Sequence, residues 1–175
     1  MNASPVRRAA LGALFAAAFV GACGYRVVGL GGQLPGGVTR VEVPVFANRT
    51  SRTDIGRVLT EAFIRQLQGA AKIHVVRSEE AQALIEGIVT VYKREPITFD
   101  SKETPLENRL TIVMDVRLLA TEGTRPLFGE KAVTIRYDYP LQSDLQVNDR
   151  LEDEALIEAS KLMSQKLVSL MLEGF

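Results

Sequence analysis

Three stretches in the second half of the chain alternate apolar and polar residues, and this pattern constrains the fold more than any other feature. The clearest stretch runs from Arg109 to Leu119, where every second residue is apolar; residues 83–92 and 133–139 are the other two. Because successive side chains of a strand point to opposite faces, each stretch predicts a strand with one apolar and one polar face. Polar segments at residues 93–107 and 121–126 separate the stretches. The three strands are therefore predicted to form an antiparallel meander with loops at those two segments.

Two segments carry the residue spacing of amphipathic helices. In the first, residues 55–67, apolar residues recur every three or four positions, and Gly69 is expected to end the helix. The second is the last long segment of the chain, residues 149–172. Asp149 with Glu152 three residues later resembles a capping box, which predicts that this helix begins at Asp149.

Two shorter apolar stretches, residues 39–45 and 72–76, predict further strands, and Pro44 is expected to lie at a sheet edge or to end the first of them. The order of the elements predicts an α+β fold, with two helices packed on one face of a mostly antiparallel, mixed sheet of four to five strands. The other sheet face is expected to meet water or a partner. Its polar residues are Thr111, Asp115, Arg117, Thr134, Arg136 and Asp138.

Residues 1–22 have the layout of a secretory signal peptide. Two arginines precede an uncharged stretch, residues 9–22, that is shorter than the about 20 apolar residues of a membrane-spanning helix. The stretch ends at the only Cys of the chain, and residues 20–23, Val-Gly-Ala-Cys, resemble a bacterial lipobox. Cys23 is therefore expected to become the mature N-terminus and to carry an N-acyl group such as palmitate and an S-diacylglycerol; the alternative is a free thiol behind a cleaved leader. Gly24 resembles the residue at that position in lipoproteins sorted to the outer membrane.

These features divide the chain into three parts. Residues 1–22 form the signal peptide, residues 23–38 the lipidated N-terminus and a glycine-rich tether, and residues 39–175 a single α+β domain. The glycines of the tether lack the spacing of a phosphate-binding loop, so they are expected to give a flexible connection between the bilayer and the domain. The lipid anchors the protein because each buried CH₂ contributes about 0.8 kcal/mol.

Composition and motif content argue against several classes of function. The 21 basic and 21 acidic side chains balance, whereas nucleic-acid binders normally carry a basic excess. One Cys and one His cannot build the usual zinc cage, so no metal or other cofactor is expected apart from the lipid on Cys23. His74 falls inside a predicted strand, no GxSxG motif is present, and the carboxylates are adjacent in sequence rather than spaced to converge. The chain is therefore not expected to be an enzyme.

Four motifs follow one another along the chain: Cys-Gly-Tyr at residues 23–25, VPVFANRT at residues 43–50, LTEAF at residues 59–63 and AQALIEGI at residues 81–88. Together they resemble the LPS-assembly lipoprotein family, LptE. The resemblance implies a lipid-anchored protein on the periplasmic side of a Gram-negative outer membrane. It further implies that the protein assembles with the LPS-translocating β-barrel LptD, plugs that barrel, and binds lipopolysaccharide during its transport to the cell surface. The implied partners are LptD, lipopolysaccharide and the bilayer, with no nucleic acid.

Lipopolysaccharide carries phosphates, for which Lys and Arg side chains are suitable donors. The candidate residues for contact with these phosphates are Lys93 and Arg94, at the end of the first predicted meander strand. Behind them lie Lys102, Arg109, Arg117, Lys131 and Arg136. Ordinary surface charge is the alternative interpretation for each of these residues. Two other functions also stay open, namely a secretion-channel pilot or assembly factor of similar fold and a lipid-tethered periplasmic hydrolase or binding module.

Overall fold

The computed structural model of the protein describes residues 34–70, 72–122 and 126–173. The predicted signal peptide, residues 1–22, and the predicted lipidation site, Cys23, lie outside the described residues. No helix within the described ranges is both long enough and apolar enough to cross a bilayer.

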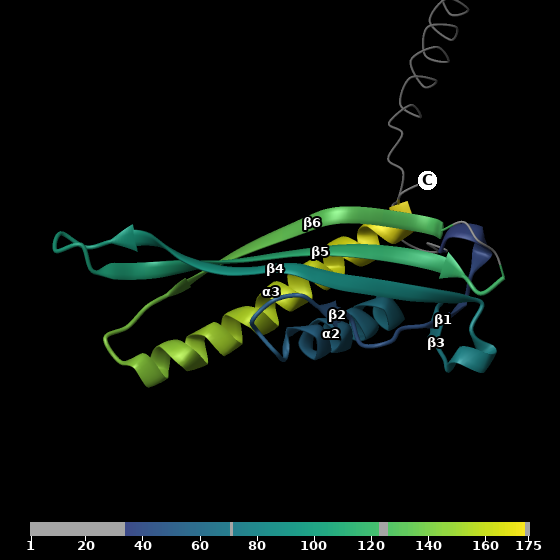
Figure 1. Ribbon diagram of the computed structural model, residues 1–175, viewed down its shortest axis with the longest axis horizontal. Coiled ribbons are helices and arrows are strands. Elements are labelled where there is room, and N and C mark those ends of the chain that lie inside the picture. Colours follow the sequence, from purple (N-terminus) through teal and green to yellow (C-terminus); the bar gives the residue numbers. More distant parts are fainter. Residues whose placement is uncertain (1–33, 71, 123–125, 174–175) are drawn as a thin grey trace, which may run out of the picture. The chain divides into compact units, whose positions relative to one another are not determined.

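A six-stranded mixed sheet lies against two helices, α2 (Ile55–Ala70) and α3 (Leu145–Glu173) (Figure 1). The three long strands, β4 (Ala83–Phe99), β5 (Pro105–Ala120) and β6 (Pro126–Pro140), form the predicted antiparallel meander. Both helices lie on the same side of this meander (Figure 1). The predicted α+β class and the packing of the helices on one sheet face are confirmed.

The remaining strands are short and pair in parallel. β1 (Arg40–Glu42) lies between β3 (His74–Val75) and β4, and β2 (Ala47–Asn48) pairs with β4 further along. The strand predicted over residues 39–45 is confirmed as β1, which ends at Glu42, two residues before Pro44. β2 lies beyond the predicted stretch and was not expected, so the sheet has six strands rather than four or five. Two 3₁₀ turns complete the described elements, η2 (Pro35–Gly37) and η3 (Ser78–Glu80).

The prediction of a polar loop at residues 93–107 is wrong. β4 continues to Phe99 and β5 begins at Pro105, so the two strands form one long hairpin. Pro96 is tolerated inside β4 because β2 ends opposite Val89. No other described strand pairs with the outer edge of β4 beyond that point, so the missing N–H of proline breaks no ladder hydrogen bond.

The turn of this hairpin is held by Asp100. Its carboxylate accepts hydrogen bonds from the N–H groups of Thr104 and Lys102, both at 2.8 Å, and these bonds lower the pKa of Asp100. Glu103 adopts a φ of 62°, in the left-handed region that a tight reversal requires. Lys102, one of the predicted ligands, therefore lies at the exposed tip of the hairpin.

The predicted helix at residues 55–67 is confirmed as α2, but the predicted start of the last helix is wrong. α3 begins at Leu145, and Asp144 is its N-cap because the Asp144 carboxylate accepts the N–H of Gln146 at 2.8 Å. The predicted capping box at Asp149 therefore does not form. Glu152 lies inside the helix instead, with only 7% of its side chain exposed.

The core lies between the helices and the inner face of the sheet. The apolar half of β5 points inward as its alternation predicts, and its five fully buried residues are Leu110, Ile112, Met114, Val116 and Leu118. Phe63 on α2 and Met163 on α3 are equally buried. Burying a side chain of this size contributes about 1.5–3 kcal/mol, so this layer dominates the stability of the domain.

The last residues of the predicted tether pack into the same core. Leu34 and Pro35 are buried, and Val38 is only 7% exposed. The folded domain therefore begins before residue 39, and the tether is shorter at its C-terminal end than the sequence predicts.

Phe46 fastens the segment between β1 and β2 to the core. Its ring centroid lies 5.4 Å from that of Phe63, and its N–H donates a hydrogen bond to Thr60 Oγ1 at 2.9 Å. Gly87 on β4 leaves the space that the Phe46 ring fills. A Cβ at residue 87 would lie 2.7 Å from that ring and 2.9 Å from Met114 Cε.

Gly87→Ala should lower the free energy of unfolding by about 1–3 kcal/mol, because a methyl group in this filled space forces the Phe46 ring to move. Gly69→Ala is the matched control, since nothing lies within 4 Å of a Cβ at that helical position. The control should leave stability unchanged or raise it by up to about 1 kcal/mol. Urea unfolding of both variants measures the difference, and equal midpoints would contradict the assigned role of Gly87.

Candidate functional site

The sheet face opposite the helices is the first candidate site, because none of the described elements covers it. Strand pairing sets its polar side chains in rows that run across β4, β5 and β6. Two adjacent rows, read from β4 to β6, are Lys93–Thr111–Arg136 and Glu95–Arg109–Asp138. We call this surface the outer face. Its polar residues are partly or fully exposed, as the prediction of contact with water or a partner requires.

Ion pairs within and between the two rows join basic side chains to acidic ones. Arg109 donates two hydrogen bonds to the carboxylate of Asp138, each 2.8 Å long, and Lys93 Nζ lies 2.5 Å from Glu95 Oε2. The hydrogen bonds from Arg109 lower the pKa of Asp138, and that from Lys93 lowers the pKa of Glu95. Exposed pairs of this kind contribute about 0–1 kcal/mol each, so their main effect is to set the local charge pattern.

Of the two aspartates on the outer face, Asp138 forms a cross-strand ion pair, with Arg109. Asp115 accepts a hydrogen bond from the N–H of Ala132 at 2.9 Å, at a bulge where β6 has one extra residue. Arg117, two residues after Asp115, pairs across the strands with Glu86 at 2.8 Å instead. A backbone bulge cannot be seen in the alternation of the sequence, which is why the partner of Asp115 was not predicted.

The structure separates the residues that the sequence groups as ligands. The outer face holds Lys93, Arg109, Arg117 and Arg136. Lys102 lies at the hairpin tip and Lys131 in the β6 bulge, both exposed. Arg94 points the other way, toward α3, because neighbouring residues of a strand face opposite sides of the sheet.

Arg94 belongs to a partly buried polar cluster centred on Glu152 of α3. Glu152 Oε1 accepts hydrogen bonds from the Tyr92 hydroxyl at 2.6 Å and from Arg52 Nη1 at 3.2 Å, and Oε2 accepts one from Arg94 Nη1. Burial raises the pKa of Tyr92, and the hydrogen bond to Glu152 raises it further. The cluster therefore joins α3, β4 and the segment before α2 through one carboxylate.

Arg52 extends this cluster to two further carboxylates. Its Nε lies 2.6 Å from Asp54 Oδ1, and its Nη2 lies 2.6 Å from Asp153 Oδ1. The hydrogen bond from Arg52 lowers the pKa of Asp54. Arg52 is three-quarters buried, and its contacts connect the segment before α2 to α3.

Sequence reasoning placed Glu152 at a helix terminus and missed this cluster. The spacing of Glu152 from its apolar neighbours marks it as a buried position of the helix. Ala155 and Leu156 follow it by three and four residues, and Ala159 follows it by seven. Those positions form the buried stripe of α3. A carboxylate on a buried stripe requires a cationic or hydrogen-bonding partner, and Arg52, Tyr92 and Arg94 supply it.

The described residues hold no cluster of side chains suited to a metal ion. His74 lies exposed in β3, and no cluster of three or more His, Cys, Asp and Glu side chains that could bind a metal occurs in the described ranges. The outer face, with its charged rows, is the exposed polar surface that the described elements leave available to a ligand or partner.

Residues 38–171 match the family LptE, described as lipopolysaccharide-assembly. This chain belongs to that family. The match begins before β1 and ends within α3, so it covers nearly all of the described domain and confirms the resemblance seen in the sequence motifs. None of the curated proteins compared with the chain matches it.

Solved structures similar to this LptE-family domain include three from other bacteria. A protein of Xanthomonas campestris superposes with a TM-score of 0.57 at 13% identity, covering 85% of this chain and 91% of its own. A candidate lipoprotein of Caulobacter crescentus gives 0.56 at 12% identity, with 77% and 89% covered. Lipoprotein B of Nitrosomonas europaea gives 0.53 at 14% identity, with 84% and 92% covered. At these identities the likeness concerns the fold.

The family motifs of this chain are explained by packing. Phe46 and Gly87 interlock in the core, as described above, and Asn48 organises the turn that follows β2. The Asn48 carboxamide oxygen accepts the N–H of Thr50 at 2.8 Å, and its amide donates to the carbonyl of Arg52 at 2.7 Å. Asn48 therefore fixes the backbone from which Arg52 reaches Glu152.

Glu152→Gln should lower the free energy of unfolding by about 1.5–3 kcal/mol, the range for hydrogen bonds to a charged group, because it leaves Arg52 and Arg94 without their shared carboxylate. Glu154→Gln is the matched control, since the Glu154 side chain is 64% exposed and should change stability by less than about 0.5 kcal/mol. Chemical denaturation at pH 7 compares them. A control as destabilised as Glu152→Gln would argue against the cluster.

Proposed function

We propose that this LptE-family protein is an outer-membrane lipoprotein that assembles with the LPS-translocating β-barrel LptD, plugs it, and binds lipopolysaccharide on its way to the cell surface. The family match over residues 38–171 is the observation that carries the proposal. In this proposal the acyl groups on Cys23 hold the protein on the periplasmic side of the outer membrane, and the folded domain acts by binding rather than by catalysis.

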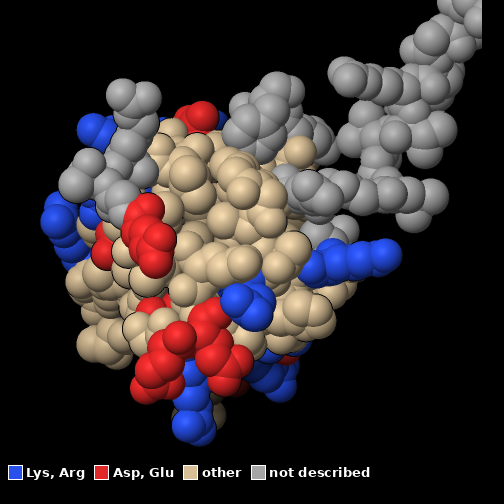
Figure 2. All heavy atoms as spheres, turned by 90° about the vertical axis from the view of Figure 1, so that its right-hand side faces the viewer, with Lys and Arg blue, Asp and Glu red and all other residues tan. Residues whose placement is uncertain are grey.

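The charge pattern of the surface supports the role of a plug. The lumen of a transmembrane barrel is polar, so a domain inside it must present polar groups of both signs. Across the outer face, Arg109 pairs with Asp138, Arg117 with Glu86 and Lys93 with Glu95. Figure 2 shows the same mixture at the end of the domain near β1 and β3, where acidic and basic side chains surround an uncharged centre.

The row Lys93–Thr111–Arg136 supports binding of lipopolysaccharide phosphates. Its two cations flank a hydroxyl residue on one exposed surface, and Arg136 makes no ion pair with any other described residue. A guanidinium without a carboxylate partner keeps its donors for an anion such as phosphate. Arg94 is a weaker candidate than Lys93, because it points toward α3 and pairs with Glu152, whereas Lys93, although paired with Glu95, lies on the outer face.

Co-purification from detergent-solubilised outer membranes tests the assembly with a barrel. The tagged full chain should bring down a large β-barrel protein, identified by mass spectrometry, and depletion of the chain should reduce the mature form of that barrel. Recovery of a secretin ring would support the pilot function instead. Recovery of neither would contradict assembly with a channel and leave the tethered binding module.

Lys93→Gln combined with Arg136→Gln should weaken lipopolysaccharide binding about tenfold or more, because each lost charge-assisted hydrogen bond is worth about 1.5–3 kcal/mol. Arg57→Gln with Lys161→Gln is the control, since it removes the same charge from exposed helical positions. Titration calorimetry of the full chain with purified lipopolysaccharide measures both. Equal affinities for the two double variants would exclude the row as the binding site.

A further inference from the structure

The outer edge of β6 is open along the described part of the sheet, because β5 is its only partner strand there. The N–H of Leu141 donates to the carbonyl of Leu106 at 2.7 Å, which makes residues 141 and 106 a hydrogen-bonded pair. Such pairs alternate along an antiparallel ladder, so the odd-numbered residues before Leu141 also direct their peptide groups toward β5. The peptide groups of Arg136 and Asp138 therefore point outward.

One end of this edge is closed. Lys166 of α3 donates a hydrogen bond to the outward carbonyl of Thr134 at 3.1 Å. Just before it, the bulge at Ala132, with a φ of 53°, breaks the regular ladder. Natural sheets protect their edges by such devices, and here they leave residues 135–139 as the accessible length.

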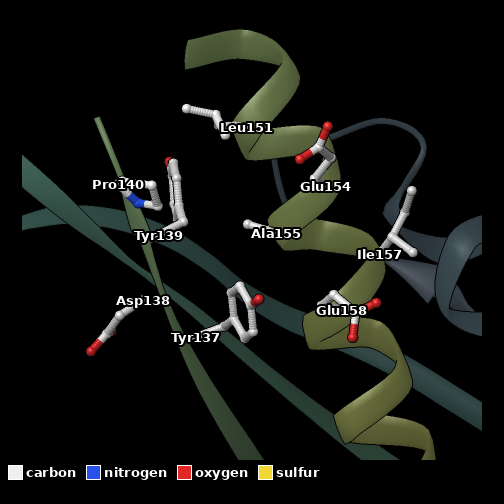
Figure 3. Close-up of a pocket in the computed structure, with 9 residues that line it drawn as sticks. All are labelled: Tyr137, Asp138, Tyr139, Pro140, Leu151, Glu154, Ala155, Ile157 and Glu158. Atoms are coloured by element: carbon white, nitrogen blue, oxygen red, sulfur yellow. The ribbon is translucent and has the colours of Figure 1, made fainter. Parts of the chain in front are cut away.

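A cavity of about 330 Å³ lies beside that accessible length, between β6 and α3. Figure 3 shows the rings of Tyr137 and Tyr139 projecting from β6 toward α3, whereas Asp138 points the opposite way. Leu151 and Ile157 line the cavity from the helix, and Ile157 is 54% exposed. The cavity thus offers aromatic and aliphatic walls to a side chain that arrives along the edge of the sheet.

The helical rim of the cavity is acidic. Glu154 and Glu158 both line it, and their side chains are 64% and 47% exposed. Their nearest cations are on their own helix, Arg150 at 3.8 Å from Glu154 and Lys161 at 3.5 Å from Glu158. These are long contacts, so both carboxylates keep most of their acceptor capacity for a partner.

We propose that the open edge of β6 and this cavity form a docking site for an extended basic polypeptide segment. The segment adds to β6 as a further strand through the outward peptide groups of Arg136 and Asp138. On the side facing α3, an aromatic or branched residue fills the cavity, and Lys or Arg residues two positions away on either side pair with Glu154 and Glu158. The site follows from the geometry alone; that the segment belongs to the barrel partner rests on the proposed function.

Charge separates this occupant from lipopolysaccharide. The acidic rim repels phosphates, and an acyl chain supplies no donors or acceptors for the open peptide groups of β6. An extended basic peptide satisfies both the backbone groups and the carboxylates. The docking site is therefore distinct from the cationic row on the outer face.

A peptide titration tests the site directly. The probe is the blocked peptide Thr-Lys-Thr-Tyr-Thr-Lys-Thr, whose Lys, Tyr and Lys share one face of a strand, and the full chain is used in detergent. Binding should shift the amide resonances of residues 135–139. Glu154→Lys with Glu158→Lys should weaken binding at least tenfold, whereas Glu61→Lys, an exposed position on α2, should not.

Two control peptides make the outcome decisive. Replacing both lysines of the probe by glutamate tests the acidic rim, and methylating the backbone nitrogens that face β6 tests the strand pairing. Both changes should abolish binding. Equal binding of the probe and its glutamate form, or resonance shifts confined to other faces of the domain, would overturn the proposal.

Photocrosslinking in the outer membrane identifies the source of the segment. A photoreactive residue at position 157 should crosslink to the barrel that co-purifies with the chain, and one at position 57 on α2 is the control for exposure. If a barrel co-purifies but crosslinks only from position 57, the barrel does not occupy this site. If no barrel co-purifies, the proposed function fails, and the peptide titration still decides whether the docking site exists.

Discussion

The carboxylate of Glu152 is the interaction on which the arrangement of the helices depends. It lies on the buried stripe of α3, where an unpaired charge would cost several kcal/mol. Arg52 reaches it from the segment before α2, and Tyr92 and Arg94 reach it from β4. Because these donors come from different elements, only one placement of α3 on the sheet satisfies the charge. Apolar packing supplies most of the stability, and this cluster fixes the register of the helix.

The residues of the family motifs stabilise the segment from which Arg52 reaches the Glu152 cluster. Phe46 anchors the segment that leaves β1, Gly87 gives its ring room, and Asn48 shapes the turn that carries Arg52. These motif residues therefore hold the sheet and helices together. The resemblance to the family therefore rests on packing residues, which say nothing of the polar residues on the strand faces that the packing leaves free.

The class of fold could be predicted because its main signals are periodic. Alternation in residues 109–119 and helical spacing in residues 55–67 depend on burial, which the structure bears out. The wrong predictions concern residues whose tertiary contacts outweigh the preference of their local sequence. Most of the polar residues 93–107, namely 93–99 and 105–107, pair as strands, and Glu152 lies against the core although its spacing from Asp149 resembles a cap. For the candidate ligands, the sequence could identify exposed cations but not the face of the sheet on which each one lies.

The period of two in a strand then separates the functions of neighbouring residues. Lys93 faces outward, where it pairs with Glu95 on the exposed face, while Arg94 faces inward and completes the Glu152 cluster. The same rule operates on β6, where Arg136 and Asp138 project side chains onto the outer face and Tyr137 and Tyr139 project into the cavity beside α3. The cationic row and the acidic rim consequently lie on opposite sides of one strand. Such a sheet can hold an anionic lipid on one face and a basic polypeptide at its edge without the two charges competing, because the strand itself separates them.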